Sequence, residues 1–380
     1  VSVEPFVGGD DTFVMIAPVA GDAGLRKAGA GVLALAGSGL YTGETVVAAG
    51  VLRLDATDAL SETSGVVIED GATLRFGVAG LALGPSAFKL SGVARIDTAG
   101  YDGRIDTAIA DDPARPGQLI KAGTGTLTLA GAVTWRCGTT IEAGRLTMAA
   151  GGILPTVGTV TIAGGGVLDV GGQDQTIGGL AGAAGAVVVN GAAGAAVLTV
   201  GGDRGSTRYD GSFVEEPGAG ALRLVKTGAG TLTLGGASSH SGGTVLSQGT
   251  LVLAASGAVG SGRLDLAADT TLAFGANGVS VAPSSVRFSG VGRFDSAGFD
   301  GEIVAAIADD GTTAGRFVKT GAGRLTLAGP GSWRGGTTIE AGRLTLSGAG
   351  ALPTAGAVTI AAGGVLDLGG RSQTIGSLAG

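Results

Sequence analysis

The sequence has very few of the residues on which catalytic, metal-binding and disulfide-stabilised proteins depend. It contains one cysteine, Cys137, and one histidine, His240. A single cysteine excludes both an internal disulfide framework and a cysteine-rich zinc site. Aromatic residues make up 4 % of the chain and charged residues 14 %. With 10 prolines, and glycines that follow no strict every-third-residue period, the chain is not a collagen.

The chain also lacks an excess of positive charge and a targeting segment. Its formal net charge is −7 and it has no cluster of lysines and arginines, which argues against nucleic-acid binding. The uncharged stretch 175–202 is long enough to span a bilayer, but its glycine-rich turns and Asn190 argue against a transmembrane helix. The chain opens VSVEPFVGGDD, without methionine or a basic segment, so we expect it to be part of a longer protein.

Glycine is the residue that the chain has in excess. Glycines account for 78 of the 380 residues, while 44 % of the residues are hydrophobic. That apolar content is sufficient for a packed core, so disorder is not expected. The glycine content disfavours long helices. It favours many short strands joined by tight turns, because glycine adopts positive φ angles without steric cost.

An internal repeat organises the sequence. Residues 121–182 and 319–380 align at an offset of 198 without a gap, and 43 of the 62 positions are identical. Two weaker copies begin at Lys27 (KAGAGVLALAG) and Lys226 (KTGAGTLTLGG). In every copy a K-x-G-x-G turn leads into an alternating L-x-L segment, and a second alternating segment follows. This period of two is typical of half-buried β-strands.

The repetition of such strands predicts an all-β fold, a parallel β-helix. Strands this short cannot bury an apolar face alone, whereas stacked coils of about 20 residues bury a continuous ladder of Leu, Val and Ile. We expect one continuous solenoid with N-terminal coils over 1–26, repeat units over 27–120, 121–225 and 226–318, and a truncated unit over 319–380.

Several motifs occur in a fixed order: VKTGAGTLTLGG (225–236), HSGGTV (240–245), WRGGTTIEAGRLTL (333–346) and GGVLDLGGRSQTIGSLAG (363–380). Together they resemble the autotransporter-associated β-strand repeat, also called the passenger-associated transport repeat, of type V secreted proteins of Gram-negative bacteria. The resemblance implies a right-handed, single-stranded parallel β-helix displayed outside the cell. It also implies a C-terminal outer-membrane β-barrel translocator in the full-length protein.

A flat ring occurs fourteen residues after each leading lysine. These residues are Tyr41, Trp135, His240 and Trp333. A row of rings along a solenoid can present a stacking surface for sugars, so these four residues are candidates for surface contact. The alternative is that the rings pack within the wall of the solenoid. The shared position also favours packing over catalysis for His240, although serines flank it.

Paired carboxylates recur at matching places, as Asp111-Asp112 and Asp309-Asp310. They are candidates for the acid and base of a polysaccharide-cleaving enzyme. The alternative is that they belong to solvated loops between coils. Cys137 stands where the matching copy has a glycine, and we interpret it as a small residue tolerated at a turn. For the leading lysines we expect the stem to cover the apolar wall while the ammonium stays in water.

The sequence therefore predicts a non-enzymatic, surface-exposed autotransporter passenger segment. It would be a β-helical stalk or adhesin that contacts a host-surface, glycan or self-association ligand, and that assists its own secretion by folding progressively. We expect no catalytic site, no cofactor, no metal site and no membrane span in this segment, and an extracellular or cell-surface location. The alternatives are a β-helical polysaccharide lyase or hydrolase, and a structural filament or surface-layer component.

Overall fold

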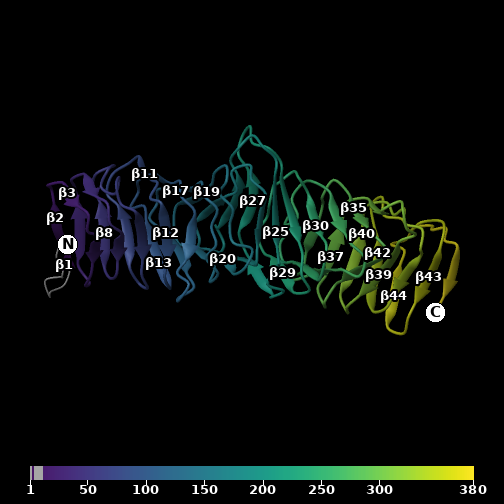
Figure 1. The fold of residues 1–380 in the computed structure, drawn as a ribbon. Coiled ribbons are helices and arrows are strands. Elements are labelled where there is room, and N and C mark those ends of the chain that lie inside the picture. Colours follow the sequence, from purple (N-terminus) through teal and green to yellow (C-terminus); the bar gives the residue numbers. More distant parts are fainter. Residues whose placement is uncertain (1, 4–11) are drawn as a thin grey trace. The chain divides into compact units, whose positions relative to one another are not determined.

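The structure is a computed structural model that describes residues 2–3 and 12–380. Over these residues it consists of strands and tight turns, without a helix (Figure 1). Parallel strands stack as a β-solenoid of about 18 turns, which confirms the predicted parallel β-helix. Within the N-terminal coils predicted over 1–26, residues 1 and 4–11 lie outside the described residues.

The chain divides into two compact units, which we describe separately. Unit 1 comprises Val1–Gly178 and Gly185–Gly191, and unit 2 comprises Gly179–Ala184 and Ala192–Gly380. In both units the strands are parallel and line three faces, which we number 1, 2 and 3 in the order in which unit 1 reaches them.

The strands of unit 1 are short, mostly of three to five residues. Face 1 contains β1 (Ser2–Val3), β4 (Leu25–Lys27), β7 (Thr45–Val47), β9 (Gly65–Ile68), β12 (Ala87–Leu90) and β15 (Ile109–Asp111). Face 2 contains β2 (Thr12–Met15), β5 (Val32–Leu35), β8 (Val51–Leu54), β10 (Thr73–Phe76), β13 (Val93–Asp97), β16 (Gln118–Ala122), β18 (Thr139–Ile141) and β20 (Thr159–Ile162). Face 3 contains the pair β3 (Val19–Gly21) and β6 (Gly39–Tyr41), and then β11 (Leu81–Leu83), β14 (Gly103–Ile105), β17 (Thr126–Leu129), β19 (Arg145–Met148), β21 (Val167–Asp169) and β24 (Val187–Asn190); the unit also includes β22 (Gln175–Ile177).

Unit 2 repeats this arrangement. Face 1 contains β25 (Ala196–Val200), β28 (Leu222–Lys226), β30 (Thr244–Leu246), β32 (Leu264–Leu266), β35 (Val286–Phe288) and β38 (Ile307–Asp309). Face 2 contains β23 (Gly179–Gly182), β26 (Thr207–Tyr209), β29 (Thr231–Leu234), β31 (Thr250–Leu253), β33 (Thr271–Phe274), β36 (Val291–Asp295), β39 (Arg316–Thr320), β41 (Thr337–Ile339), β43 (Ala357–Ile360) and β45 (Ser377–Ala379). Face 3 contains β34 (Val279–Val281), β37 (Gly301–Ile303), β40 (Arg324–Leu327), β42 (Gly342–Leu346) and β44 (Gly364–Asp367); β27 (Ser212–Glu215) precedes it.

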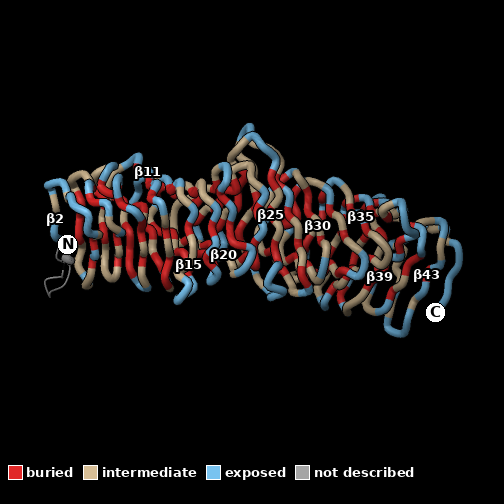
Figure 2. Tube along the Cα trace, in the orientation of Figure 1, coloured by how far each residue is buried: buried red, intermediate tan, exposed pale blue. Residues whose placement is uncertain are grey.

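The core of each unit is a set of ladders of inward-pointing side chains. On face 2 of unit 1, for example, Leu33 pairs with Leu52, Leu52 with Leu74, and Leu74 with Ile96. All four residues are buried, and Figure 2 shows the same alternation of buried and less buried residues along the strands. Burying each such side chain contributes about 1.5–3 kcal/mol. The solenoid therefore holds together without disulfides.

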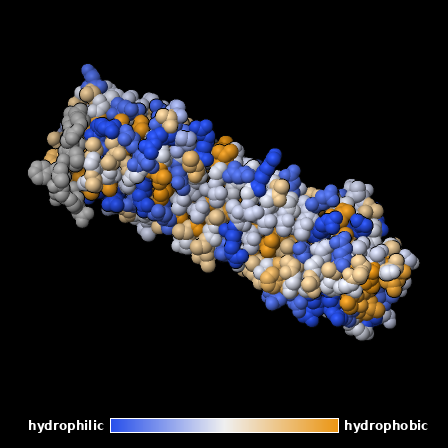
Figure 3. All heavy atoms as spheres, turned by 90° about the horizontal axis from the view of Figure 1, so that it is seen from below, coloured by the Kyte–Doolittle hydropathy of each residue, from blue (hydrophilic) through white to orange (hydrophobic). Residues whose placement is uncertain are grey.

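The outer surface carries threonines and arginine–carboxylate pairs, and Figure 3 shows charged and apolar side chains interspersed on the visible face. The pair Arg136–Asp111 (2.7 Å) in unit 1 corresponds to Arg334–Asp309 (2.9 Å) in unit 2. In both pairs the arginine is exposed, whereas the aspartate side chain is only 8 % (Asp111) or 5 % (Asp309) exposed. Because these ion pairs join residues of successive coils, we interpret their main role as fixing the register in which the coils stack.

Consecutive copies of the repeat begin on different faces. In unit 1, Lys27 lies on face 1 and Lys121 on face 2. The ladder from Lys27 runs through four coils and reaches Asp111, ten residues before Lys121. In unit 2, Lys226 and Lys319 have the same relation. The repeat is therefore longer than a whole number of coils.

Candidate functional site

The most distinctive feature of the repeat is a lysine that points into the core. In strand register Lys121 lies between Ile96 and Ile141 of the neighbouring coils. All four leading lysines are buried: Lys27, Lys121, Lys226 and Lys319. The expectation that their ammonium groups stay in water is therefore wrong. The side chain follows the inward direction of its strand, and the ammonium finds acceptors inside the coil.

Backbone carbonyls surround each ammonium group. Lys121 Nζ donates to the carbonyl oxygens of Ala122 (2.9 Å), Gly123 (2.7 Å) and Ala143 (3.0 Å), and to Thr98 Oγ1 (3.1 Å). In all four copies the three carbonyls belong to the next residue, the one after it, and a residue 22 positions later, on the following coil. An ammonium group has three N–H donors, so three carbonyls satisfy it. We call this arrangement the lysine clamp.

The glycine of the K-x-G turn is required by the clamp. It has a φ of 71° to 75° in all four copies, Gly29, Gly123, Gly228 and Gly321. A Cβ atom on Gly123 would lie 2.3 Å from the backbone nitrogen of Ala99. Only glycine can therefore turn the chain here and present its carbonyl to the lysine.

Burial shifts the proton affinity of the clamp. Desolvation lowers the pKa of Lys121, Lys226 and Lys319 to about 8, and it also lowers the pKa of Lys27. A lowered pKa can mark a nucleophilic lysine. Here the N–H donors are engaged by carbonyls of the lysine's own coil and of the following coil, and at neutral pH the group remains protonated. The lysine therefore links one coil to the next by hydrogen bonds and does not resemble a nucleophilic lysine.

The four rings lie inside the solenoid. Tyr41, Trp135, His240 and Trp333 have exposed fractions of 2 % or less. This burial corrects the expectation that they contact a surface ligand, because a ring in the core cannot stack on a sugar outside it. Trp333 instead stacks on Phe317, with centroids 4.9 Å apart. The ring position of the repeat is a core position.

The polar atom of each ring forms a hydrogen bond with the hydroxyl of a buried threonine four residues later. The pairs are Tyr41–Thr45 (2.6 Å), Trp135–Thr139 (3.0 Å), His240–Thr244 (3.0 Å) and Trp333–Thr337 (3.1 Å). A buried indole N–H or phenol needs such a partner. Each repeat therefore contains two buried hydrogen-bonded contacts, the lysine clamp and the ring–threonine pair.

The ring–threonine pair can be tested with Thr139→Val. We expect this change to lower the free energy of unfolding by about 1–3 kcal/mol, because it leaves the Trp135 Nε1–H buried without an acceptor. In a Trp135→Phe background the same change should cost at least about 1 kcal/mol less, since no donor remains. Urea unfolding of the four variants measures this coupling. Equal costs in both backgrounds would contradict the role of the hydrogen bond.

His240 differs from the other three rings in one respect. The Thr244 hydroxyl donates to the Val259 carbonyl (3.0 Å), so His240 Nε2 carries the hydrogen of the His240–Thr244 bond. Its Nδ1 atom is buried and has no hydrogen-bond partner in the part of the chain that the structure describes. Burial lowers the pKa of His240 to about 4, although Glu215 opposes this shift. The imidazole is therefore neutral at neutral pH.

The paired carboxylates stabilise the loops that follow them by accepting hydrogen bonds from loop backbone groups and from an arginine of the next coil. Asp309 accepts from Arg334 Nε (2.9 Å) and from the backbone N–H of Gly315 (3.3 Å), and Asp111 accepts from Arg136 (2.7 Å) and Gly117 (2.6 Å) in the same way. Hydrogen bonds hold the pKa values of the Asp309, Asp112 and Asp310 carboxyl groups below their usual range. They come chiefly from Arg334 to Asp309, from the Ala114 backbone to Asp112 and from the Thr313 backbone to Asp310. Carboxyl groups with lowered pKa values are poor general acids at neutral pH.

Other chemical groups give no site. Cys137 is exposed, and its Sγ lies 3.6 Å from the Pro116 carbonyl. Among the described residues, no group of three or more His, Cys, Asp and Glu side chains could hold a metal ion. The same residues contain no helix that is long and apolar enough to cross a membrane.

The sequence does contain the signal for the inward lysines. Lys121 follows Leu119 by two residues, and Lys319 follows Phe317 by two residues. Leu119 and Phe317 are both buried. Each lysine is thus in phase with the apolar alternation of its strand, and a period of two assigns it to the inner face.

Comparison with known proteins identifies these coils. Residues 25–54, 119–148, 224–253 and 317–346 match the model of the passenger-associated-transport-repeat, and each match contains one lysine clamp and one ring–threonine pair. The chain carries four passenger-associated-transport repeats. This confirms the resemblance seen in the sequence.

A curated relative of the repeat region is described as an adhesin BmaC autotransporter from Brucella suis biovar 1 (strain 1330). It is 34 % identical over 162 residues, which is 40 % of this chain. The aligned part spans only 4 % of the relative's length. No solved structure matches the chain.

Proposed function

We propose that this chain is a segment of a non-enzymatic autotransporter passenger, displayed at the bacterial cell surface as a β-helical stalk or adhesin. The observation that carries the proposal is the set of four passenger-associated-transport repeats, each built around a lysine clamp. The relative whose printed description is an adhesin supports a role in surface contact. In the full-length protein we expect a C-terminal outer-membrane translocator and release or display of the passenger outside the cell.

The lysine clamp supports a second part of the proposal, secretion assisted by progressive folding. One of the three carbonyls around each ammonium belongs to the following coil, for example Ala143 for Lys121 and Ala341 for Lys319. A coil that emerges alone leaves its lysine incompletely satisfied. Docking of the following coil completes the clamp, so each step of stacking is favoured and reversal is opposed.

The alternative of a polysaccharide lyase or hydrolase receives less support. The carboxylates that it needs are held by loop hydrogen bonds, and three of them have lowered pKa values. A filament or surface-layer component would be revealed by ordered self-assembly of the purified chain.

Deletion of residues 226–308 from the full-length protein tests the secretory role. This deletion removes four whole coils and brings Asp309 to the face 1 position of Lys226, so the coils on either side of the join stay in register. We expect less passenger to become accessible to protease on intact cells, because one whole set of coils no longer contributes to outward folding. The amount of the same protein in the outer-membrane fraction serves as the control. Equal surface exposure with and without the deletion would contradict assisted secretion.

Surface contact is tested separately. Cells that display the full-length protein should adhere to host-cell or abiotic surfaces more than cells that lack it. Surface display without any gain in adhesion or aggregation would contradict the adhesin role and would be consistent with a stalk alone.

A further inference from the structure

The outer surface of face 1 in unit 2 has an unpaired arginine. Most arginines of this surface have a carboxylate partner, as Arg263 does with Asp265 (2.7 Å). Asp265 is also within 3.8 Å of Arg223. Arg287, on the next strand and in register with Asp265, has no ion pair or hydrogen-bonded acceptor among residues 2–3 and 12–380. Two guanidinium groups therefore share the Asp265 carboxylate, and Arg287 adds a third positive charge on the neighbouring strand, so the local charge is positive on a chain of net charge −7.

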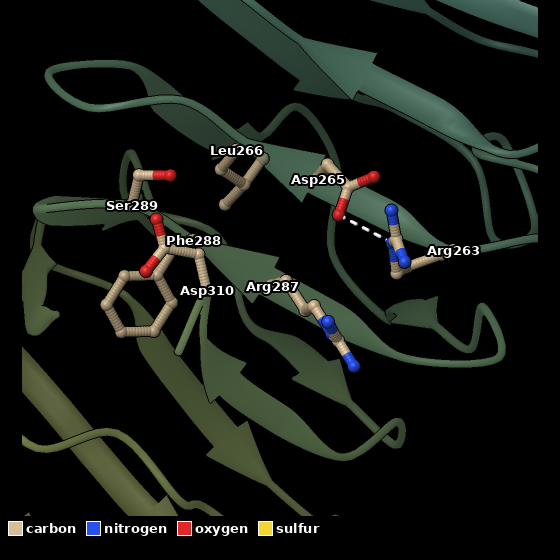
Figure 4. A pocket seen from close by; sticks show the side chains of 7 residues that line it. All are labelled: Arg263, Asp265, Leu266, Arg287, Phe288, Ser289 and Asp310. Atoms are coloured by element: carbon tan, nitrogen blue, oxygen red, sulfur yellow. Dashed lines mark ion pairs between the residues drawn. The ribbon is translucent and has the colours of Figure 1, made fainter. Parts of the chain in front are cut away.

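Arg287 lines a small open pocket of about 210 Å³. Figure 4 shows Arg263 and Arg287 on one side of this pocket and Ser289 and Asp310 on the other. The pocket thus has a cationic end and an end with a hydroxyl and a carboxylate. Its volume is below the range of about 300–1,000 Å³ that is usual for drug-sized ligands. It fits a single small unit of a larger molecule, and its open side leaves room for the remainder.

The carboxylate end can accept hydrogen bonds. Asp310 Oδ1 already accepts from the backbone N–H groups of Thr312 (2.9 Å) and Thr313 (3.0 Å) and from the Thr313 hydroxyl (3.3 Å), which hold the carboxylate in place. Hydrogen bonds from this loop, and from Ser289, keep the pKa of Asp310 well below its usual range. An ionised carboxylate offers about four acceptor positions. Oδ1 is occupied by the loop, so a ligand hydroxyl would donate to Asp310 Oδ2.

Unit 1 carries the corresponding residues at an offset of 198 positions. Lys89, Ser91 and Asp112 stand where unit 2 has Arg287, Ser289 and Asp310. Ser91 Oγ donates to Asp112 Oδ2 (2.9 Å), and Lys89 has no ion-pair partner within the described part of the chain. The combination of a free cation, a serine and an ionised aspartate thus occurs once in each unit.

We propose that the Arg287 pocket binds an acidic saccharide unit, one that carries a carboxylate and neighbouring hydroxyl groups. The carboxylate lies on Arg287, whose planar guanidinium can donate two parallel hydrogen bonds, with Arg263 beside it. The hydroxyl groups donate to Asp310 and bond to Ser289. A simple anion would use only the cationic end, and a neutral sugar only the other end. This inference rests on the proposed function of surface contact and names the ligand chemistry of that contact.

Binding to the purified chain tests the inference. The probe is an oligosaccharide of alternating glucuronic acid and N-acetylglucosamine, and its carboxyl-reduced form is the neutral control. Isothermal titration should show that carboxyl reduction weakens binding at least tenfold, and that Arg287→Ala does the same. Arg287→Lys should retain part of the affinity. Arg316→Ala is the matched control, because Arg316 is also exposed but does not line the pocket; it should change the affinity less than twofold.

Three results would overturn the inference. They are equal binding of the carboxyl-reduced oligosaccharide, equal effects of Arg287→Ala and Arg316→Ala, and full competition by inorganic sulfate at the same concentration as the oligosaccharide. The last result would mean a simple anion site.

Cell adhesion separates this inference from the function on which it rests. If displayed protein adheres equally with and without the change Arg287→Ala, and the oligosaccharide does not inhibit adhesion, the acidic-saccharide inference is overturned while the passenger function stands. A purified chain that binds the oligosaccharide through Arg287, in a protein that never reaches the cell surface, would overturn the passenger function while the binding site stands.

Discussion

Replacing Lys121 with methionine is expected to lower the free energy of unfolding by about 1–3 kcal/mol. The change removes the ammonium donor from the carbonyls of Gly123 and Ala143, and each buried carbonyl without a partner costs about 1–3 kcal/mol. The Ala122 carbonyl keeps its bonds from the backbone N–H (3.0 Å) and the hydroxyl (3.1 Å) of Thr98. Against this, methionine relieves the desolvation of the ammonium, which a pKa of about 8 in place of 10.5 puts at roughly 3 kcal/mol. The lost hydrogen bonds outweigh the relief, and methionine fills most of the volume of the lysine stem.

Urea unfolding followed by tryptophan fluorescence measures the effect of Lys121→Met. Lys89→Met is the matched control, because Lys89 is only partly buried and lies on the outer side of its strand; it should change the free energy by less than about 0.5 kcal/mol. The difference should also depend on pH. Between about 8 and 10.5 the unfolded chain binds more protons than the folded chain, so wild-type stability rises with pH through that window and the variant lacks this rise. Equal stability of the two variants would argue against the clamp.

Acid is expected to destabilise the third repeat through His240. The pKa of the buried imidazole is about 4, below its ordinary value of 6.5. Between these values the unfolded chain binds the proton and the folded chain does not, so stability is lost as the pH falls from about 6.5 to about 4. A shift of this size corresponds to roughly 3 kcal/mol. The physical reason is that an imidazolium at this position would be buried with a second N–H, on Nδ1, that has no acceptor among the described residues.

Comparison of wild type with His240→Phe isolates this effect. Phenylalanine keeps a flat ring in the position but does not titrate, and Thr244 retains its bond to the Val259 carbonyl. The urea midpoint of the wild type should fall more than that of His240→Phe between pH 7 and pH 4. Tyr41→Phe, which alters the same position of the first repeat, should leave the acid sensitivity of the wild type unchanged. Parallel pH profiles of wild type and His240→Phe would show that the histidine is not the acid-sensitive group.

Much of the fold follows from patterns that sequence reasoning can interpret. The alternation in segments such as Leu127-Thr128-Leu129 places leucine inside and threonine outside, and the structure buries both leucines. Repetition of such segments predicts stacking, because no single coil can bury its own apolar face. The candidate site was harder to predict. The spacing places the four rings at one recurring position and leaves two possibilities, a surface for ligand contact and packing within the wall, and the structure shows that they pack within the wall.

The four buried lysines show why the polar contacts inside the solenoid could not be predicted from the sequence. A lysine is rarely buried, so its usual behaviour suggests a head group in water. The carbonyls that make burial possible come from a turn and from a residue 22 positions later, and local sequence does not reveal that these two places meet. The same holds for Asp111 and Arg136, which belong to successive coils.

The sequence by itself determined the coil. Its alternating strands, its K-x-G turn and its recurring ring and threonine specify which side chains face inward, because a strand has a period of two wherever it lies. Only the tertiary structure decided which groups meet across coils. Four coils carry the ladder from Lys27 only as far as Asp111, so successive repeats begin on different faces, and the position of a residue around the solenoid depends on accumulated coil lengths. Coil lengths also decide that Arg287 lies next to Asp265, which already pairs with Arg263 and Arg223. No local sequence pattern predicts this arrangement.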